Sequence, residues 1–371
     1  MKKYSTLIML LLCSIASAQN LNDVLRYSSE NLQGSARFQS MGGAFGALGG
    51  DLSALNVNPA GAAVFNNSLL GLSGTNYNRN NDASYFNGRS TTKLNSLEFN
   101  QIGGVIVFNN KEESPWRKLT LAVNYDLANN FDNEFFVSGN SNQGIDNYFL
   151  DYAEGVPLGS ILLQDGEFLE DAYLDIGSQQ GFVDQQAFLG YYGGIFDPAE
   201  NTDENIAYIS NADYTTVNQE FIRRTTGYNS KFVVNGAAQY GENLYLGASL
   251  NFHTILYNRY DEFTEDGYDA TSLNQFTTFD NYLRTQGNGF SFSLGAIGKL
   301  NDFIRIGGSY QTPTWYRLND NLSQRIDSDL ADEDINFINF NLINTFDTYT
   351  LKTPSKLTGS LAFVFGKNAM W

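Results

Sequence analysis

Cysteine, histidine, proline and positive charge are all scarce in this chain. Cys13 is the only cysteine among 371 residues, and the chain has one histidine and six prolines. Because Cys13 lies in an N-terminal segment that we expect to be removed, disulfide frameworks and thiolate metal sites are excluded for the mature protein. There are 22 Lys and Arg against 40 Asp and Glu. Nucleic acid is therefore not an expected partner, since phosphate binding needs clustered basic residues.

Residues 1–18 have the order of a secretory signal peptide. Lys2-Lys3 precedes an apolar run from Leu7 to Ile15, and Ala16-Ser17-Ala18 is followed by Gln19. This order predicts cleavage before Gln19. Its removal would bring the formal net charge from −18 to −20, because two lysines are lost. A lipid anchor on Cys13 is the alternative, and Leu12 disfavours it because a small residue is expected at that position.

Long hydrophobic runs are missing from the rest of the chain. No later segment offers the roughly 18 consecutive apolar residues that a transmembrane helix needs. Aromatic residues nevertheless make up 14% of the chain, and 35 residues are glycine. An exported chain of this composition indicates an outer-membrane β-barrel. A secreted β-sandwich or β-solenoid is the alternative that composition alone leaves open.

Alternation of side chains favours the barrel. Phe290, Phe292 and Leu294 fall on one face of an extended segment, and Ser291, Ser293 and Gly295 fall on the other. Apolar residues alternate with small or polar ones in the same way at 119–128, 244–253 and 357–365. This pattern is typical of a membrane barrel wall, with apolar side chains outward. We predict about ten strands, near residues 68–77, 96–109, 118–138, 213–226, 229–241, 243–264, 279–300, 302–320, 340–352 and 355–366.

The connections between these strands differ in length. Gly241-Glu242-Asn243 and Asn301-Asp302 predict tight turns. Residues 139–212 are expected to form a long, acidic extracellular insertion. Within it, 147–154 and 168–174 predict short amphipathic helices, because a structureless loop of that length is unusual. Residues 261–278 and 319–339 predict smaller connections of the same kind.

Residues 19–67 do not alternate. Leu21, Val24 and Leu25 recur at helical spacing, which predicts a short helix before a glycine-rich run. A phosphate-binding loop is excluded, because no strand precedes this run and no suitably placed lysine follows it. Small side chains permit close approach to a wall, so the run predicts a plug inside the barrel. Its candidate hatch or gating residues are Gly42, Gly43, Gly46, Gly49, Gly50, Asp51, Asn58, Pro59, Ala60 and Gly61.

The order of these features resembles a known family. A signal peptide, a Gly- and Ala-rich segment, Asp51 with Ser53, and Asn58-Pro59-Ala60-Gly61 before the first strand resemble the FadL and TodX family of outer-membrane transporters for long-chain fatty acids and hydrocarbons. Thr312-Pro313 and the segment 351–366 look like later strands of its Bacteroidetes-type members. The resemblance implies a 14-stranded transmembrane antiparallel β-barrel at 68–371, a hatch at 19–67 inside the lumen, and lateral release of the ligand.

The resemblance also implies partners, and the length of the last segment indicates a truncated sequence. The expected partners are outer-membrane lipid, a hydrophobic small molecule and the barrel assembly machinery during insertion, with the protein acting as a monomer in the cell outer membrane. Three residues after Gly366-Lys367-Asn368 are too few for a strand of ~10 residues. We therefore expect the sequence to be truncated, with the last strands of the barrel missing.

Candidate ligand contacts are aromatic and basic residues of the insertion and the strand after it: Phe182, Phe188, Tyr191, Tyr192, Phe196, Arg223 and Arg224. The aromatic ones have an alternative role as the insertion's own core, and the arginines as partners of nearby acids. His253 is interpreted as an ordinary polar residue of the lumen, because no Ser or Asp arrangement for nucleophilic catalysis accompanies it. We expect no enzyme activity and no cofactor. A general diffusion porin and a haem uptake receptor are the alternative functions.

Overall fold

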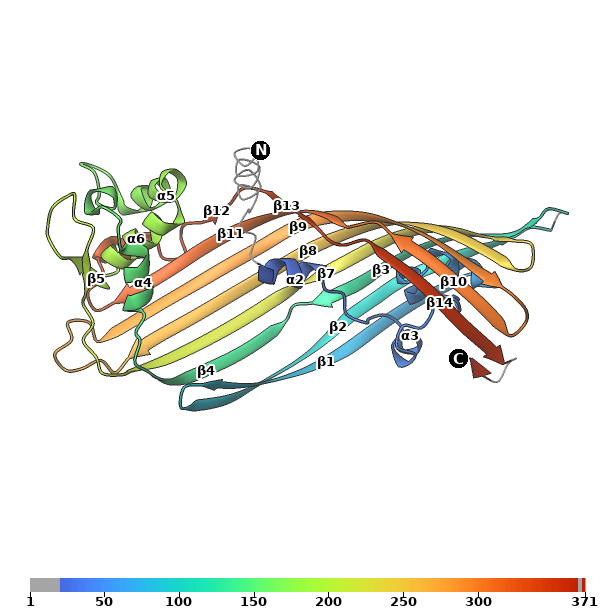
Figure 1. Cartoon of the computed structure of the whole chain (residues 1–371), viewed down its shortest axis with the longest axis horizontal. Coiled ribbons are helices and arrows are strands. Elements are labelled where there is room, and N and C mark those ends of the chain that lie inside the picture. The colour runs from blue at the N-terminus through green and yellow to red at the C-terminus, as the bar shows by residue number, and fades with distance from the viewer. Residues whose placement is uncertain (1–20, 112, 366–368, 371) are drawn as a thin grey trace, which may run out of the picture.

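The computed structural model describes residues 21–111, 113–365 and 369–370 (Figure 1). The predicted signal peptide, the turn at 366–368 and Trp371 lie outside these ranges. The described chain is mostly antiparallel β-sheet, with 52% of residues in strands and 18% in helices, and its main sheet curls into a half-barrel. The predicted antiparallel β class is confirmed. Among the described residues, no helix is long and apolar enough to cross a membrane.

The main sheet has thirteen strands within the described residues. Its central order is β1-β2-β3-β7-β8-β9-β10-β14-β15, and β5 pairs with β6 in a separate small sheet. The strands are β1 (Leu69–Tyr85), β2 (Gly88–Asn109), β3 (Trp116–Asn130), β4 (Asn133–Ser141), β5 (Phe196–Pro198), β6 (Tyr208–Ser210), β7 (Val217–Tyr240), β8 (Leu244–Asp266), β9 (Phe276–Lys299), β10 (Ile304–Gln311), β11 (Trp315–Ser328), β12 (Asn344–Thr345), β13 (Tyr349–Lys352), β14 (Lys356–Phe365) and β15 (Ala369–Met370).

Several of these strands are pieces of one longer strand. β3 and β4 both pair with β7, while β10 and β11 both pair with β9. β13 and β14 continue each other along β11 and β10. Pro313 and Pro354 stand at the last two interruptions. Proline has no N–H for the ladder, so two neighbouring strands break there.

The predicted alternation positions the two faces of the sheet. In β3, Leu119, Leu121 and Val123 are each 50% exposed on the convex face, whereas Thr120 and Ala122 between them are 0% and 3% exposed. Successive side chains of a strand point to opposite faces, so the concave face receives the small and polar residues. The same alternation of exposed and covered residues runs along β8 and β9.

The insertion folds into a helical cap at one end of the sheet, on the left in Figure 1. It contains α4 (Asp146–Ala153), η3 (Leu158–Ser160), α5 (Leu169–Gln179) and α6 (Phe182–Tyr192), and η4 (Glu333–Phe337) packs beside it. α4 and α5 confirm the two predicted helices. The cap's core rests on Phe279 of β9 and Ile326 of β11.

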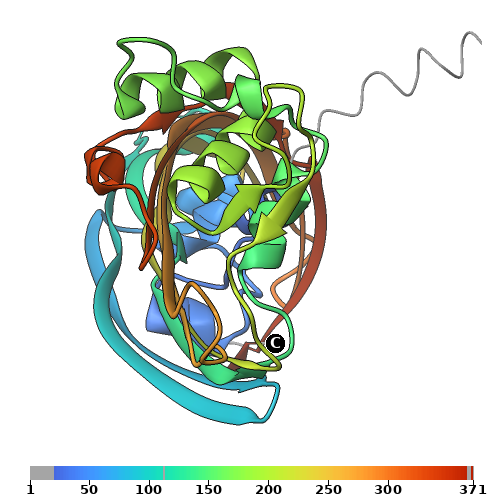
Figure 2. The same cartoon turned by 90° about the vertical axis from the view of Figure 1, so that its left-hand side faces the viewer.

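The N-terminal segment, residues 21–65, lies inside the curl of the sheet (Figure 2). It consists of α2 (Leu21–Ser28), α3 (Ala36–Ser40), η1 (Leu52–Asn56) and η2 (Pro59–Val64) joined by coil. The predicted helix over Leu21–Leu25 is confirmed, although its buried anchor is Tyr27, whose ring packs edge-on against Phe131 and Tyr257. η1 and η2 share an apolar core with Val105, Ala122, Ala237, Tyr245 and Ile297 of the wall.

Several strand boundaries differ from the prediction, and the predicted strands at 118–138, 302–320 and 340–352 are each divided in two. β7 runs unbroken through Gly227, where a turn was expected, because Gly227 adopts a φ of 117° without leaving the ladder. β1 and β2 extend further than predicted, to a turn at Phe86-Asn87. The prediction missed these parts because they have polar residues on both faces and therefore no apolar alternation. Residues 261–266 and 319–328 continue β8 and β11 rather than forming loops.

Candidate functional site

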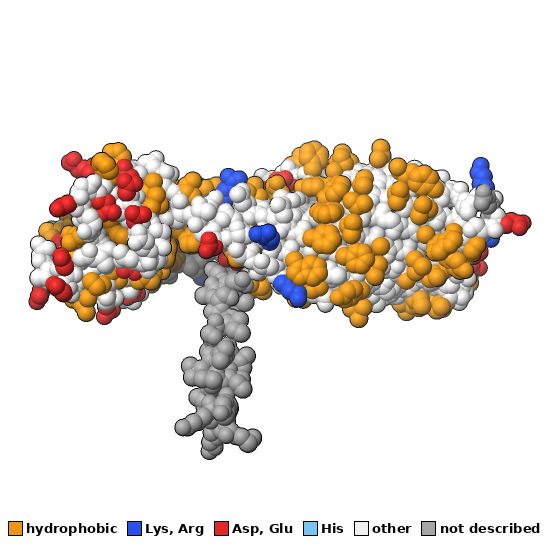
Figure 3. Space-filling view, turned by 90° about the horizontal axis from the view of Figure 1, so that it is seen from above, with side chains coloured by type: hydrophobic (Ala, Val, Ile, Leu, Met, Phe, Trp, Pro, Cys, Tyr) orange, Lys and Arg blue, Asp and Glu red, His pale blue; other side chains and the backbone are white. Residues whose placement is uncertain are grey.

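Exposed apolar side chains gather on the convex face near the end with the tight turns (Figure 3). The acidic side chains gather at the opposite end, over the cap (Figure 3). Large exposed apolar patches mark sites of interaction with another protein, a membrane or an apolar ligand. The most exposed members include Leu70, Leu97, Phe99, Ile102, Leu121, Phe252, Leu294, Leu357 and Leu361.

Asn58 fastens the N-terminal segment to the wall. Its side chain is buried, and its Nδ2 donates to the Gly46 carbonyl at 2.7 Å and to the Ala296 carbonyl of β9 at 3.0 Å. Its Oδ1 accepts from the Ala60 amide at 3.0 Å, which caps η2, with Pro59 at the first helical position. One amide side chain therefore joins two parts of the segment to the sheet.

Glycines on both sides allow this close approach. A Cβ on Gly46 would lie 1.9 Å from Ser360 Oγ of β14, and a Cβ on Gly49, at φ 61°, would lie 2.8 Å from the Cα of Gly61. On the wall, a Cβ on Gly247 would lie 2.5 Å from the backbone of Pro59, and one on Gly307 would lie 2.2 Å from the Gly46 carbonyl oxygen. Only residues without a Cβ fit these positions.

The other candidate hatch residues lie in the same segment. Gly42, Gly43 and Gly50 have positive φ values of 60°, 74° and 69°, which suit glycine at turns. Ala60 and Gly61 are buried within η2. The structure thus places all the predicted residues in one segment, of which Gly46, Asn58 and Pro59 contact the wall whereas Gly42 is exposed.

A buried polar chain connects Asp51 to the wall. Asp51 accepts from the Ser53 amide at 2.9 Å and from Ser35 Oγ at 2.7 Å. Ser53 Oγ contacts the side-chain amide of Gln101 on β2, whose Nε2 donates to Asp126 on β3 at 3.0 Å. Such networks stabilise one arrangement strongly when every member is satisfied.

The ladder between β2 and β3 stops at this point. β2 pairs with β3 only as far as Gln101 and Asp126, whereas the β1–β2 hairpin continues to its turn. Further along, β1 reaches β3 through a side chain, from Arg79 Nη2 to the Asn130 carbonyl at 2.8 Å. We use the term wall break for the stretch in which residues 88–100 of β2 and residues 127–130 of β3 are not paired with each other.

Residues 31–34 bridge the wall break. On one side, the Asn31 amide donates to the Ala128 carbonyl of β3 at 3.3 Å. On the other side, Asn100 Nδ2 of β2 donates to the Gly34 carbonyl at 3.1 Å, and Tyr77 of β1 donates to Gln33 Oε1 at 2.5 Å. The segment thus gives the buried Ala128 carbonyl a partner that the ladder does not supply, as a buried backbone group requires, and it meets β1 and β2 through their side chains.

A cavity of about 230 Å³ adjoins the wall break. Its lining includes Glu30, Leu32 and Phe38 of the segment, with Asp126 of β3 and Lys231 of β7. The Glu30 carboxylate pairs with Lys356 Nζ of β14 at 2.6 Å. Apolar and charged groups therefore meet where the segment covers the wall.

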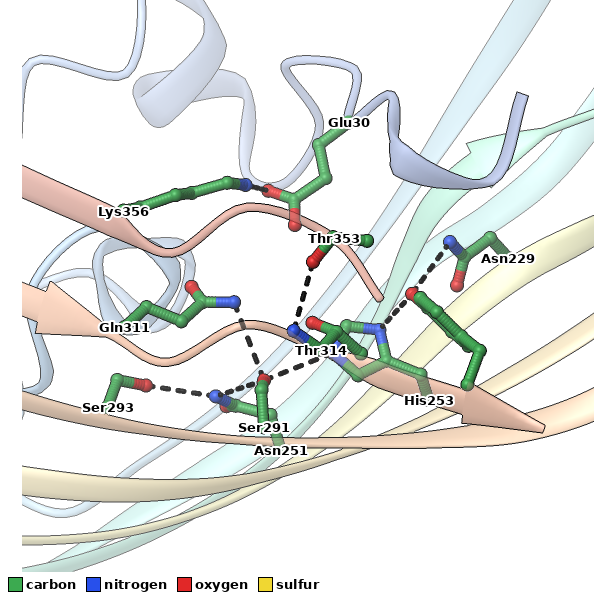
Figure 4. Close-up of polar contacts among 11 residues, drawn as sticks. Glu30, Asn229, Asn251, His253, Ser291, Ser293, Gln311, Thr314, Thr353 and Lys356 are labelled. Carbon is green, nitrogen blue, oxygen red and sulfur yellow. Dashed lines mark hydrogen bonds and ion pairs between the residues drawn. The ribbon is translucent and has the colours of Figure 1, made fainter. Parts of the chain in front are cut away.

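His253 lies beside this region in a polar cluster (Figure 4). It is 2% exposed, and its Nδ1 is 3.1 Å from Tyr316 Oη while its Nε2 is 3.5 Å from Ser291 Oγ. Asn251 donates to Ser291 and Ser293 in the same cluster. No carboxylate completes a nucleophile–base arrangement among these contacts, so the cluster can orient and hydrogen-bond but carries no visible catalytic set.

The two proline interruptions also meet here. The Thr314 amide donates to Thr353 Oγ1 at 2.9 Å, and the Thr353 amide donates to the Thr314 carbonyl at 3.0 Å (Figure 4). These two bonds join β10–β11 to β13–β14 at the prolines.

The predicted ligand contacts are not brought together around this cavity. Phe188 and Phe196 are completely buried in the cap's core, and Tyr191 and Tyr192 pack against it. Phe182 stacks edge-on against Tyr152 of α4. This burial favours the alternative interpretation, in which the aromatic residues form the insertion's own core.

Both predicted arginines are paired with acids. Arg223 forms two hydrogen bonds to the Asp261 carboxylate, at 2.6 and 2.8 Å. Arg224 pairs with Glu134 at 3.0 Å and lies 3.8 Å from Glu262. This matches the alternative role, as charges that balance acidic neighbours.

Sequence reasoning missed Glu30, Gln101, Asp126, Lys231 and Lys356. Asp126 and Lys231 stand at alternating positions among apolar residues, which marks them as inward-facing, but nothing local marks their neighbours on other strands. Among the described residues, no group of three or more His, Cys, Asp or Glu could hold a metal ion. Comparison with known proteins finds no matching family model, no matching curated protein and no matching solved structure.

Proposed function

We propose that the half-barrel belongs to a transmembrane antiparallel β-barrel of the cell outer membrane that takes up hydrophobic small molecules, such as long-chain fatty acids. The observation that carries the proposal is the double role of the N-terminal segment. It fills the concave side through Asn58, and its residues 31–34 bridge the wall break. In this role the segment is the hatch of a 14-stranded barrel.

The convex face supports a membrane setting. Long strands carry exposed Leu, Phe and Ile on one face, and small or polar side chains on the other. An apolar band of this kind suits contact with lipid chains. The acidic cap then faces away from the band and outward from the cell.

The wall break supports lateral release. Moving an apolar chain through water costs about 0.8 kcal/mol per CH₂, so a route from a partly apolar cavity directly into lipid is cheaper than a water-filled pore. Hydrogen bonds from residues 31–34, rather than a continuous strand ladder, close the break. Displacing a few such bonds requires less free energy than separating paired strands.

The polar concave face favours a second candidate, a general diffusion porin. Asn124, Asn235, Asn251 and Ser293 line that face and would suit a hydrophilic channel if the N-terminal segment left a path beside it.

Flux measurements in liposomes separate the two functions. The full chain is reconstituted, and entry of a long-chain fatty acid is compared with entry of a small sugar, before and after deletion of residues 19–60. We expect fatty-acid entry without sugar leakage from the intact protein, and sugar leakage only after the deletion. Sugar entry through the intact protein would overturn the transporter in favour of the porin.

A further inference from the structure

Glu30 of the N-terminal segment forms an ion pair with Lys356 of β14. It follows α2, immediately before the residues that bridge the wall break, and its carboxylate lies 2.6 Å from Lys356 Nζ on β14 (Figure 4). The side chains of Glu30 and Lys356 are 35% and 47% exposed. A pair this open to solvent stabilises the fold only slightly, so another charged group can exchange with either partner.

A second lysine faces the same carboxylate. Lys231 of β7 is 3% exposed and lines the 230 Å³ cavity together with Glu30. Partial burial alone would raise the pKa of Glu30, but Lys231 and Lys356 outweigh burial and lower that pKa to about 2. The position therefore strongly favours a negative charge.

The ammonium of Lys231 attracts Asp126, the other acid of the cavity, but no hydrogen bond joins the two side chains. The Asp126 carboxylate accepts hydrogen bonds from Asn56 at 3.0 Å, Gln101 at 3.0 Å and Asn124 at 2.6 Å. Within the described part of the chain, the side chain of Lys231 forms no hydrogen bond and no ion pair within 4.0 Å. A buried ammonium that borders a cavity without a direct partner is a site for an incoming anion.

We infer that Lys231 and Lys356 form a carboxylate-binding site which the Glu30 side chain occupies, and that the carboxylate of an apolar acid competes with Glu30 for both lysines. This inference rests on the proposed function and narrows its substrates to apolar carboxylic acids, with neutral hydrocarbons excluded as triggers. Leu32 and Phe38 of the cavity lining meet the apolar part of the acid nearest its carboxylate.

Displacement of Glu30 has a direct mechanical consequence. Asn31 is its chain neighbour and holds Ala128 and Asn129 across the wall break. When Glu30 leaves Lys356, residues 31–34 lose the ion pair that holds their N-terminal end to β14. Ligand binding and opening of the wall break are therefore coupled. A ligand shifts such an equilibrium only through its different affinities for the two states.

The test compares palmitate with methyl palmitate, which differ at the group that the site recognises. Binding of each is measured by titration at pH 8 on the purified full chain in nanodiscs. We expect Glu30→Gln to tighten palmitate binding severalfold, because the internal competitor is lost. Lys356→Gln and Lys231→Gln should each weaken palmitate binding about tenfold, the loss of one charge-assisted contact.

Matched controls make the result specific. Lys93→Gln and Glu204→Gln change the same residue types at exposed positions on β2 and in the cap, and should leave both affinities unchanged. Unchanged binding of methyl palmitate shows that each variant is folded, which matters most for the buried Lys231. Lys231→Arg serves as a second variant that keeps the charge and should retain palmitate selectivity.

The outcomes separate the two proposals. Equal binding of acid and ester by the wild type, or palmitate affinities that no variant changes, would overturn the carboxylate site and leave the hydrophobic transporter standing. Binding of neither compound would overturn both. Selective loss of palmitate binding in the lysine variants, with selective gain in Glu30→Gln, would support the site.

Discussion

Asn58 and Gly295 meet where the N-terminal segment is closest to the wall: a Cβ on Gly295 would lie 2.0 Å from Asn58 Oδ1. The same oxygen caps η2 through the Ala60 amide. Gly295 therefore makes room for the side chain that fastens the segment, and any larger residue at this position pushes Asn58 out of its place.

Gly295→Val should unseat the N-terminal segment while leaving the sheet intact. Overpacking of this kind costs about 1–3 kcal/mol, and here the cost falls on the docking of the segment. We expect faster protease cleavage within residues 21–65 and sugar leakage in liposomes. Gly308→Val is the matched control, because a Cβ there would meet nothing within 4 Å. Equal cleavage rates in the two variants would contradict the packing argument.

Asn58→Ala should weaken the same attachment through lost hydrogen bonds. It removes the side-chain oxygen that caps η2 at the Ala60 amide, and the bonds to the carbonyls of Gly46 and Ala296. Together these losses amount to about 2–4 kcal/mol. Hydrogen exchange of the η2 amides should accelerate strongly, whereas the exposed Asn67→Ala should change nothing. Unaltered exchange in Asn58→Ala would show that the apolar core alone holds the segment.

Much of the sheet was predictable because one face of each strand is apolar. Alternation located β3, β8, β9 and β14, and helical spacing located α2, α4 and α5. Residues 78–95 escaped prediction, since the outer parts of β1 and β2 are polar on both faces and carry no periodic signal. The glycine-rich run predicted close packing, but not which wall glycines it meets.

The candidate site was less predictable for a physical reason. Glu30, Lys231 and Lys356 come together through the register of β7, the curl of the sheet and the path of the coil after α2. The sequence next to each of the three residues does not determine this register, this curl or this path. The proline at 354 marked an interruption, yet its proximity to Pro313 follows only from pairing of β10 with β14.

A disulfide between residue 31 of the bridging segment and β3 should keep the segment in place over the wall break. Asn31 Nδ2 lies 2.8 Å from Asn129 Oδ1, so Asn31→Cys with Asn129→Cys places two thiols close enough to join after small adjustment. Under oxidising conditions we expect fatty-acid flux to fall to background, and to return when a reductant is added. The pair Asn140→Cys and Asn218→Cys links β4 to β7, which are already paired, and should leave flux unchanged. Full flux through the oxidised Asn31–Asn129 pair would exclude release of the segment from β3 as the step that opens the exit.

The contact of the coil after α2 with the wall should weaken at low pH. Glu30 faces Lys356 of β14, Lys231 of β7 and His253 of β8, and its pKa is lowered from 4.5 to about 2. Because the folded pKa lies below the unfolded one, this contribution to stability is complete above about pH 4.5 and is lost as the pH falls towards 2. Protease cleavage within residues 21–35 should therefore accelerate between pH 4.5 and 2 in the wild type, measured with an acid-stable protease. Glu30→Gln should cleave faster at pH 7 and show little further change over that window. An identical pH profile for wild type and Glu30→Gln would assign the acid response to other carboxylates and leave Glu30 without a role in holding the segment.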